Sequence, residues 1–155
     1  MNYIEILVKL RKIIRSINLE SKKIEKAYGI SIPQLLTLQF LSGQQEYRAL
    51  ARDIKEYLNL NASTVTGIIT RLEEKNLVVK VPRKDDRRGS YVILTAKGSE
   101  LLAESPTTLQ EKFSIRLKEL TTEQIADLDR NIEVLTRLLD AGDLDAAPII
   151  TNEEL

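Results

Sequence analysis

The chain has 155 residues, 43% of them hydrophobic and 30% charged, a composition typical of a single soluble, folded domain. It contains neither cysteine nor histidine, which excludes disulfides, thiolate chemistry and the commonest general base and metal ligand. No apolar run approaches the roughly 20 residues that cross a membrane, and the N-terminus alternates charged with apolar residues, unlike a secretory signal. We therefore expect a cytoplasmic protein that has no membrane partner, needs no metal or cofactor and is not an enzyme.

The net charge of zero conceals a gradient along the chain. Residues 1–43 carry 7 basic and 3 acidic residues, residues 44–98 carry 11 and 7, and residues 99–155 carry 5 and 13. The three segments therefore have net charges of +4, +4 and −8. A basic middle would suit a polyanionic partner. An uneven distribution of charged residues over surface helices explains the gradient equally well.

The first two predicted elements are helices. In the N-terminal segment apolar residues recur at helical spacing, at Ile6, Leu10, Ile13, Ile14 and Ile17. Gly29 suits the end of this helix. Ser31 and Gln34 fit a capping box that opens a second, strongly apolar helix from about Ile32 to Leu41.

Two further helical segments follow at close range. The stretch RALARDIKEYLNL, residues 48–60, has Leu50, Ile54, Tyr57 and Leu58 at helical spacing. In NASTVTGIITRLEEKNLV, Asn61 is a suitable N-cap, and one apolar stripe consists of Val65, Ile68, Ile69 and Leu72. Only about three residues separate these segments, which predicts a helix-turn-helix whose second helix begins near Ala62.

Two β-branched runs come directly after this motif. They are LVVKV, residues 77–81, and YVILT, residues 91–95, and a charged stretch that includes Gly89 joins them. Two short strands and a loop after a helix-turn-helix predict a winged helix. The predicted fold class is therefore mainly α with a small wing of two or three β-strands.

The C-terminal part of the chain returns to helical periodicity. A helix begins near Ala96 and is interrupted at Pro106, where Ser105 is a suitable cap, and helix resumes to about Leu120. Thr121 then opens another capping box, followed by a narrow seam at Ile125, Leu128, Ile132, Leu135 and Leu139. A seam of this kind packs against a partner helix. The acidic tail after position 141 lacks a helical period, and we expect it to be a loose arm.

The second helix of a helix-turn-helix lies in the major groove of DNA, with its N-terminal residues toward bases and phosphates. Here the outward-facing residues are short, and no acidic residue precedes Glu73. Such side chains let the backbone approach DNA closely, donate to phosphates and contact thymine methyls. The predicted DNA-contacting residues of this helix are Ala62, Ser63, Thr64, Thr66, Gly67, Thr70 and Arg71. The alternative is that these small residues cover the helix surface and bind nothing.

The charged stretch between the two strands occupies the position of a wing loop. Basic wing residues follow the phosphates or enter the minor groove. A carboxylate two residues before an arginine can hold its guanidinium by a bidentate pair, so we expect Asp86 to orient Arg88. The predicted wing residues are Arg83, Lys84, Asp86, Arg87 and Arg88. Taken alone, the same stretch would also fit an ordinary solvated loop.

Together these segments resemble the MarR family of bacterial transcriptional regulators. The family's wing signature is Asp-x-Arg, five residues and Leu-Thr, and it matches Asp86-Arg87-Arg88, GSYVI and Leu94-Thr95, with Gly98 following. STVTGIITRLEEKNLV is similar to the family's recognition helix and first wing strand, and YGISIPQLLTLQFL to its second helix. The resemblance covers roughly residues 5–140.

The resemblance implies a homodimer that binds a pseudopalindromic operator in double-stranded DNA and that a small-molecule effector can release. We expect a repressor, with an activator as the alternative. It also implies that residues 1–28 and 99–140 form the dimerisation region, next to a winged helix-turn-helix at 30–98 and a separate tail at 141–155.

On specific residues, the resemblance assigns DNA contacts to Ser63, Thr64, Thr66, Arg71 and Arg88. By analogy alone, an effector pocket would lie between the dimer helices and the winged helix. Its expected lining is Leu7, Arg11, Arg15, Tyr28, Leu36, Phe40 and Phe113.

Three positions depart from the family pattern. Gly67 stands where many relatives carry a longer, often basic residue, Lys55 where alanine is frequent, and Asn76 where glycine is usual. Gly67 and the zero net charge favour an alternative function, a winged-helix protein-interaction module without DNA binding. The wing arginines and the acid-free recognition surface count against that alternative. The absence of cysteine excludes the peroxide-sensing thiol of some relatives.

Overall fold

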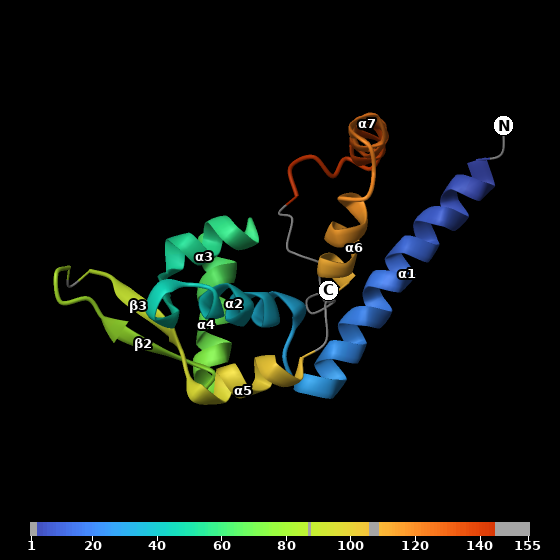
Figure 1. Cartoon of the computed structure of the whole chain (residues 1–155). Coiled ribbons are helices and arrows are strands. Elements are labelled where there is room, and N and C mark those ends of the chain that lie inside the picture. The colour runs from blue at the N-terminus through green and yellow to red at the C-terminus, as the bar shows by residue number, and fades with distance from the viewer. Residues whose placement is uncertain (1–2, 87, 106–108, 145–155) are drawn as a thin grey trace.

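The apolar segment after Ser31 forms the central helix of the fold. The computed structural model describes residues 3–86, 88–105 and 109–144, and α2 (Ile32–Ser42) runs through its middle (Figure 1). Ser31 opens α2 with the predicted capping box: its hydroxyl accepts from the Gln34 N–H, and the Gln34 side chain accepts from the Ser31 N–H. Residues 32–38 are all buried, so α2 is covered on every side there, and these residues are apolar except for Gln34 and Thr37.

The helix-turn-helix consists of α3 (Ala51–Leu58) and α4 (Ala62–Glu74). Asn59 ends α3 in the left-handed conformation, at a φ of 54°, and Asn61 caps α4 by accepting the Thr64 N–H at 2.8 Å. The predicted stripe faces the core, where α3 and α4 bury Ile54, Leu58, Val65, Ile68, Ile69 and Leu72. The start of α4 and the three-residue turn therefore confirm the prediction.

Residues Arg48–Leu50 form a strand, β1, and not the beginning of a helix. A short 3-10 turn, η1 (Gln45–Tyr47), precedes it. The prediction of helix over residues 48–60 was therefore wrong at its start. Leu50 does lie at helical spacing from Ile54, but its backbone pairs with Tyr91 on a strand far along the chain. Helical periodicity is a local signal and carries no information about such a partner.

The sheet is antiparallel, with strand order β1-β3-β2. Its two longer strands are β2 (Val78–Pro82) and β3 (Ser90–Leu94), each within one residue of the predicted bounds. Val78 and Val92 are buried at the base of the wing, whereas Val79 and Val81 are exposed. The base of the wing hairpin is therefore packed into the core, and its loop end projects away from the core (Figure 1).

The Leu-Thr and Gly part of the sequence signature joins the sheet to α5 (Ala96–Glu104). The Thr95 hydroxyl accepts from the Gly98 N–H at 3.1 Å and donates to the Asn76 carbonyl at 2.7 Å. A Cβ atom on Gly98 would lie 2.4 Å from the Leu77 carbonyl oxygen. Only glycine therefore lets α5 approach β2 this closely. Asn76 has a φ of 60°, the left-handed conformation expected at this helix end.

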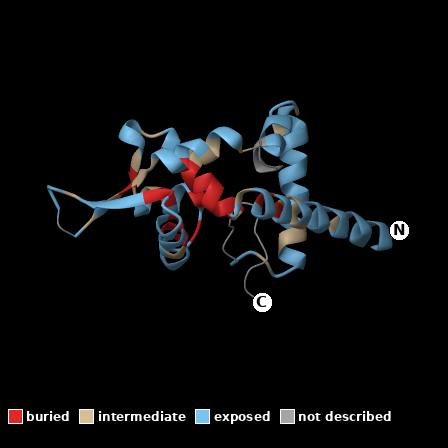
Figure 2. Ribbon diagram, turned by 90° about the horizontal axis from the view of Figure 1, so that it is seen from below, coloured by how far each residue is buried: buried red, intermediate tan, exposed pale blue. Residues whose placement is uncertain are grey.

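The remaining helices are α1 (Tyr3–Tyr28), α6 (Leu109–Leu117) and α7 (Thr122–Leu138). In α1 only Ser21 and Ile24 are buried, and α7 buries no residue. Burial is concentrated around α2, whereas α1 is exposed along most of its length (Figure 2). The apolar stripes predicted for α1 and α7 therefore face outward in a single chain.

The boundaries of the C-terminal helices follow the prediction with one shift. Thr121 forms the expected capping box with Gln124, but α6 ends at Leu117, before the predicted Leu120. The Ser105 hydroxyl donates to the Leu102 carbonyl at the end of α5. The predicted interruption at Pro106 and the tail beyond position 144 lie outside the described residues. Among the described helices, none is long and apolar enough to cross a bilayer.

Candidate nucleic-acid interface

The outward face of α4 consists of the small residues that the sequence predicted. Its exposed members are Ala62, Ser63, Thr64, Thr66, Thr70 and Arg71, and Gly67 is half-buried. The Thr66 hydroxyl donates to the Ala62 carbonyl and the Thr70 hydroxyl to the Thr66 carbonyl, both at 2.9 Å. With their hydrogens engaged, these threonines present methyl groups and oxygen lone pairs.

Gly67 lies on this face without an internal reason for being glycine. A Cβ atom added there would meet no atom within 4 Å. Glycine inside a helix costs about 0.8–1 kcal/mol relative to alanine. Because Gly67 has no side chain, a binding partner can approach the α4 backbone closely at this position.

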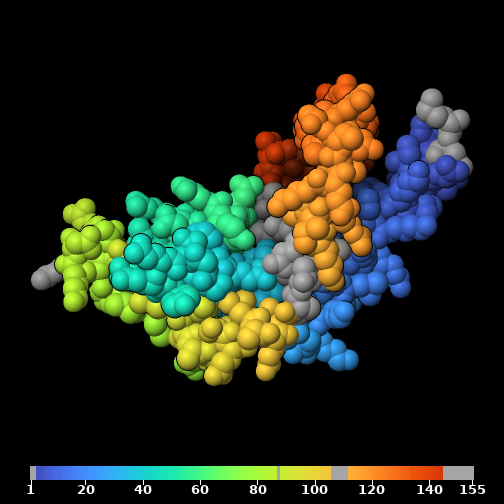
Figure 3. All heavy atoms as spheres, viewed as in Figure 1, coloured from blue at the N-terminus to red at the C-terminus, as the bar shows by residue number. Residues whose placement is uncertain are grey.

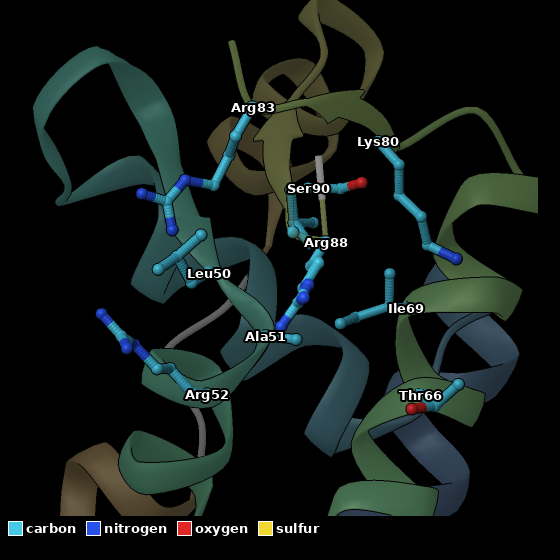
Figure 4. Close-up of a pocket in the computed structure, with 11 residues that line it drawn as sticks. Leu50, Ala51, Arg52, Thr66, Ile69, Lys80, Arg83, Arg88 and Ser90 are labelled. Atoms are coloured by element: carbon cyan, nitrogen blue, oxygen red, sulfur yellow. The ribbon is translucent and has the colours of Figure 1, made fainter. Parts of the chain in front are cut away.

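A groove of about 380 Å³ separates α4 from the wing. Figure 4 shows the Arg88 side chain extending from the wing into this groove. Four cationic side chains line the groove, and among the described residues no carboxylate does. The lining is Leu50, Ala51, Arg52, Thr66, Ile69, Lys80, Arg83, Arg88, Gly89, Ser90 and Val92. The arrangement suits a negatively charged group that rests beside α4.

Two of these cations, Arg52 and Lys80, were missed by sequence reasoning. Lys80 lies between the exposed Val79 and Val81 on β2, and Arg52 lies in the first turn of α3. In isolation each is an ordinary surface charge. Only the packing of β2 and α3 beside α4 brings them to the same groove, and no local pattern encodes that.

Two carboxylates organise the wing, and their partners correct the sequence prediction. Asp85, not Asp86, forms the bidentate pair: its two oxygens accept from Arg83 Nε at 3.1 Å and Nη2 at 2.6 Å. Asp86 accepts instead from the backbone N–H of Arg88 at 2.9 Å. Asp86 therefore holds the turn at Arg88 through the backbone.

The Arg83–Asp85 pair shifts the titration of both partners. Its hydrogen bonds lower the pKa of the Asp85 carboxyl and raise the pKa of the Arg83 guanidinium, so both stay charged at neutral pH. Lys84 is exposed at the tip of the wing. Arg87, the remaining predicted wing residue, lies outside the described residues.

The residues proposed for an effector pocket lie in three different settings. Leu36 belongs to the core, and Tyr28 and Phe40 pack against it. Leu7, Arg11 and Arg15 are exposed on α1, where the two arginines line a shallow groove along that helix. Phe113 is exposed on α6. A single chain therefore brings the first three together and leaves the others apart. In the described part of the chain no cluster of acidic residues could hold a metal ion.

Sequence comparison finds a match to a protein family and to individual relatives. Residues 28–89, from the end of α1 through β2 and the wing loop, match the model of the MarR family. The chain is 29% identical over 123 residues to the HTH-type transcriptional regulator YsmB of Bacillus subtilis, covering 79% of this chain and 83% of that protein. It is 26% identical to the transcriptional repressor IacR of Pseudomonas putida, covering 74% and 67%.

Solved structures share the fold over most of the chain. A MepR-like protein complexed with pseudoligands aligns with a TM-score of 0.63 at 26% identity, covering 90% of this chain and 97% of that one. A MarR family transcriptional regulator from Streptomyces coelicolor, in complex with DNA, aligns with a TM-score of 0.62 at 20% identity, covering 97% and 96%. The second likeness concerns the fold. Residues 28–89 therefore match the MarR family, and over the rest of the chain the likeness to these regulators is one of fold.

Proposed function

We propose that the protein is a transcriptional regulator that binds double-stranded DNA sequence-specifically as a homodimer. The observation that carries the proposal is the groove between α4 and the wing. It holds four cations, no carboxylate among the described residues, and opens beside the small-residue face of α4. Double-stranded DNA matches both features of this surface. Its phosphates are negatively charged, and they flank the major groove, where the base edges are accessible to small side chains.

The geometry gives each element a role in such a complex. The exposed face of α4 would lie in the major groove, where the methyl groups of Thr66 and Thr70 contact thymine methyls. Arg52, Lys80 and Arg88 would take the flanking phosphates, and the wing tip would reach the adjacent minor groove. The Streptomyces coelicolor regulator, which has the same fold, is in complex with DNA, and this supports DNA as the partner. Residues 30–98 would then be the DNA-binding domain.

The exposed apolar stripes support the homodimer. Figure 3 shows α6 and α1 standing away from the winged helix. On α7, the exposed residues of the predicted seam include Ile125, Leu128 and Ile132, and a contiguous exposed apolar stripe marks an interface. The charges are complementary, because α1 carries 7 basic and 3 acidic residues and α7 carries 4 acidic and 2 basic ones. A second copy can therefore cover both helices with opposite charges facing each other.

We propose repression, released by a small-molecule effector, as the output. Relatives include IacR and the homoprotocatechuate degradative operon repressor of Escherichia coli, both named as repressors. The MepR-like structure holds pseudoligands. In a dimer, the exposed Arg11 and Arg15 of α1 would come close to partner residues, where an effector pocket could be completed.

The test begins with genomic fragments that the purified protein retains at low salt. Binding to an enriched fragment is followed by fluorescence anisotropy at several salt concentrations, with the dimer monitored by sedimentation. Arg88→Ala should weaken binding about tenfold and make the slope of log affinity against log salt shallower by about one, because one phosphate contact is lost. The dimer should remain intact.

Lys118→Ala, which removes an equal charge at the end of α6, is the matched control and should bind like the wild type. Equal affinity of Arg88→Ala and wild type would contradict the assignment of the groove. A protein that retains no fragment even at low salt would instead be a winged-helix interaction module.

A further inference from the structure

The Arg83 side chain is held inside the wing rather than extended from it. Arg83 follows β2 directly, and its guanidinium is paired with Asp85 through two nitrogens, at 3.1 and 2.6 Å. The Arg83 side chain is 22% exposed, whereas that of Asp85 is 66% exposed. The pair has no net charge, and the half-buried partner is the cation. Arg83 therefore contributes less to the field of the groove than its position suggests.

Arg83 also connects the wing loop to β3. Its backbone N–H donates to the Gly89 carbonyl at 3.0 Å and closes the loop. A Cβ atom on Gly89 would lie 3.1 Å from Arg83 Cδ, so a glycine there gives the arginine room to cross the hairpin. The guanidinium carbon lies 5.8 Å from the centre of the Tyr91 ring. Tyr91 pairs with Leu50 on β1 and Val81 on β2.

The Tyr91 ring has a second cationic neighbour at the root of the sheet. The guanidinium carbon of Arg48 on β1 lies 4.2 Å from the ring centre, and Arg48 itself forms an ion pair with Glu46. Charged side chains and one ring thus link η1, β1, β3 and the wing loop in sequence. Contacts of this kind restrict the angle at which the hairpin leaves the domain.

We propose that Arg83 and Asp85 form a brace that positions the wing, and that Asp85 strengthens DNA binding although it is negatively charged. The two are positioning residues, and Lys80, Arg52 and Arg88 contact phosphates. This inference rests on the proposed DNA binding. It resolves a contradiction in the wing, where an acidic residue faces a polyanion: the carboxylate orders the loop that carries Arg88.

The brace and simple electrostatics predict opposite effects of removing Asp85 on the affinity for DNA. If Asp85 only repelled phosphates, its removal would strengthen binding, because one negative charge near the DNA would be gone. If Asp85 orders the wing, its removal weakens binding, because the loop must then be ordered when the DNA binds. The sign of one measurement therefore separates the two cases.

The experiment compares Asp85→Ala with Glu73→Ala, which removes an exposed carboxylate from the end of α4, on a genomic fragment that the wild type retains at low salt. We expect Asp85→Ala to bind about five- to tenfold more weakly, and Glu73→Ala to bind as tightly as wild type or more tightly. Asp85→Asn keeps one acceptor for Arg83 and should lie between Asp85→Ala and wild type. Affinity of Asp85→Ala equal to or above that of wild type overturns the proposal.

Two further measurements distinguish the brace from a direct phosphate contact. The salt slope of Arg83→Ala should equal that of wild type, because no phosphate contact is lost, and a slope shallower by about one would show that Arg83 is a phosphate ligand instead. Without DNA, hydrogen exchange at the Arg83 Nε–H should be slow in wild type and fast in Asp85→Ala. Equal exchange in both overturns the brace itself. A wild type that binds no DNA refutes the proposed function, while the exchange comparison still decides the brace.

Discussion

At the wing, two adjacent carboxylates have different roles because of where the chain turns. Asp85 holds the Arg83 guanidinium, and Asp86 holds the Arg88 backbone N–H. Sequence spacing alone assigned the guanidinium pair to Asp86 and Arg88. Both Asp85 and Asp86 stand two residues before or after an arginine, so spacing cannot choose between them. The hairpin decides, since it turns the Arg83 side chain back across Gly89.

The effect of Gly67 on stability and its effect on DNA binding can be measured separately. The Gly67→Ala variant should be about 0.8–1 kcal/mol more stable than wild type, because alanine favours the helix and the space there is empty. Urea denaturation measures this gain. The same variant should bind operator DNA more weakly, because its methyl group keeps the α4 backbone away from the duplex. A variant that is more stable and binds with unchanged affinity would show that Gly67 is merely tolerated.

Among the elements, α5 closely approaches the residue that precedes β2. Thr95 caps α5 and bonds to Asn76, and Gly98 lies where a side chain would meet the Leu77 carbonyl. The Leu-Thr and Gly signature therefore follows from packing between the wing and the helix after it. The segment that leads into β2 and the first turn of α5 are therefore in direct contact.

A matched pair of glycine variants tests this contact. Gly98→Ala should lower the free energy of unfolding by about 1–3 kcal/mol, because the new atom would overlap a backbone oxygen that cannot move cheaply. Gly67→Ala, the same chemical change on a helix face with open space, should raise it. Both follow from urea denaturation at one pH. An equally stable Gly98→Ala protein would mean that α5 can shift away from β2 at no cost.

In the whole molecule, burial is divided unequally between two regions. The winged helix-turn-helix has a closed core around α2, whereas α1 and α7 expose their apolar stripes. A helix such as α7 gains most of its stability from packing of its apolar face. Its partner in this protein is therefore expected to be another copy of the chain, with α1 and α7 of opposite charge facing each other.

Ile132→Asp tests the second copy. Ile132 is 49% exposed in the single chain, so a carboxylate there costs little unless another subunit covers it. We expect sedimentation equilibrium to show a shift from dimer to monomer, and operator binding to fall with it, while the circular dichroism of the winged helix persists. Asn131→Asp adds the same charge beside the stripe and should remain dimeric. A dimeric Ile132→Asp protein would place the interface elsewhere.

The sequence alone determined the features that depend on neighbouring residues. The capping boxes at Ser31 and Thr121, the start of α4 at Ala62, the inward stripe of α4 and the two wing strands were all readable, because caps, helical periods and β-branched runs act over a few residues. The outward face of α4 followed from the same period.

Only the tertiary structure decided what depends on distant segments. It turned Arg48–Leu50 into a strand by pairing it with β3, and it brought Arg52 and Lys80 to the groove beside α4. It also chose Asp85 as the partner of Arg83. The physical reason is common to all three: strand pairing and charge clustering depend on where the core has already placed the backbone, and neither spacing nor periodicity in the sequence records that placement.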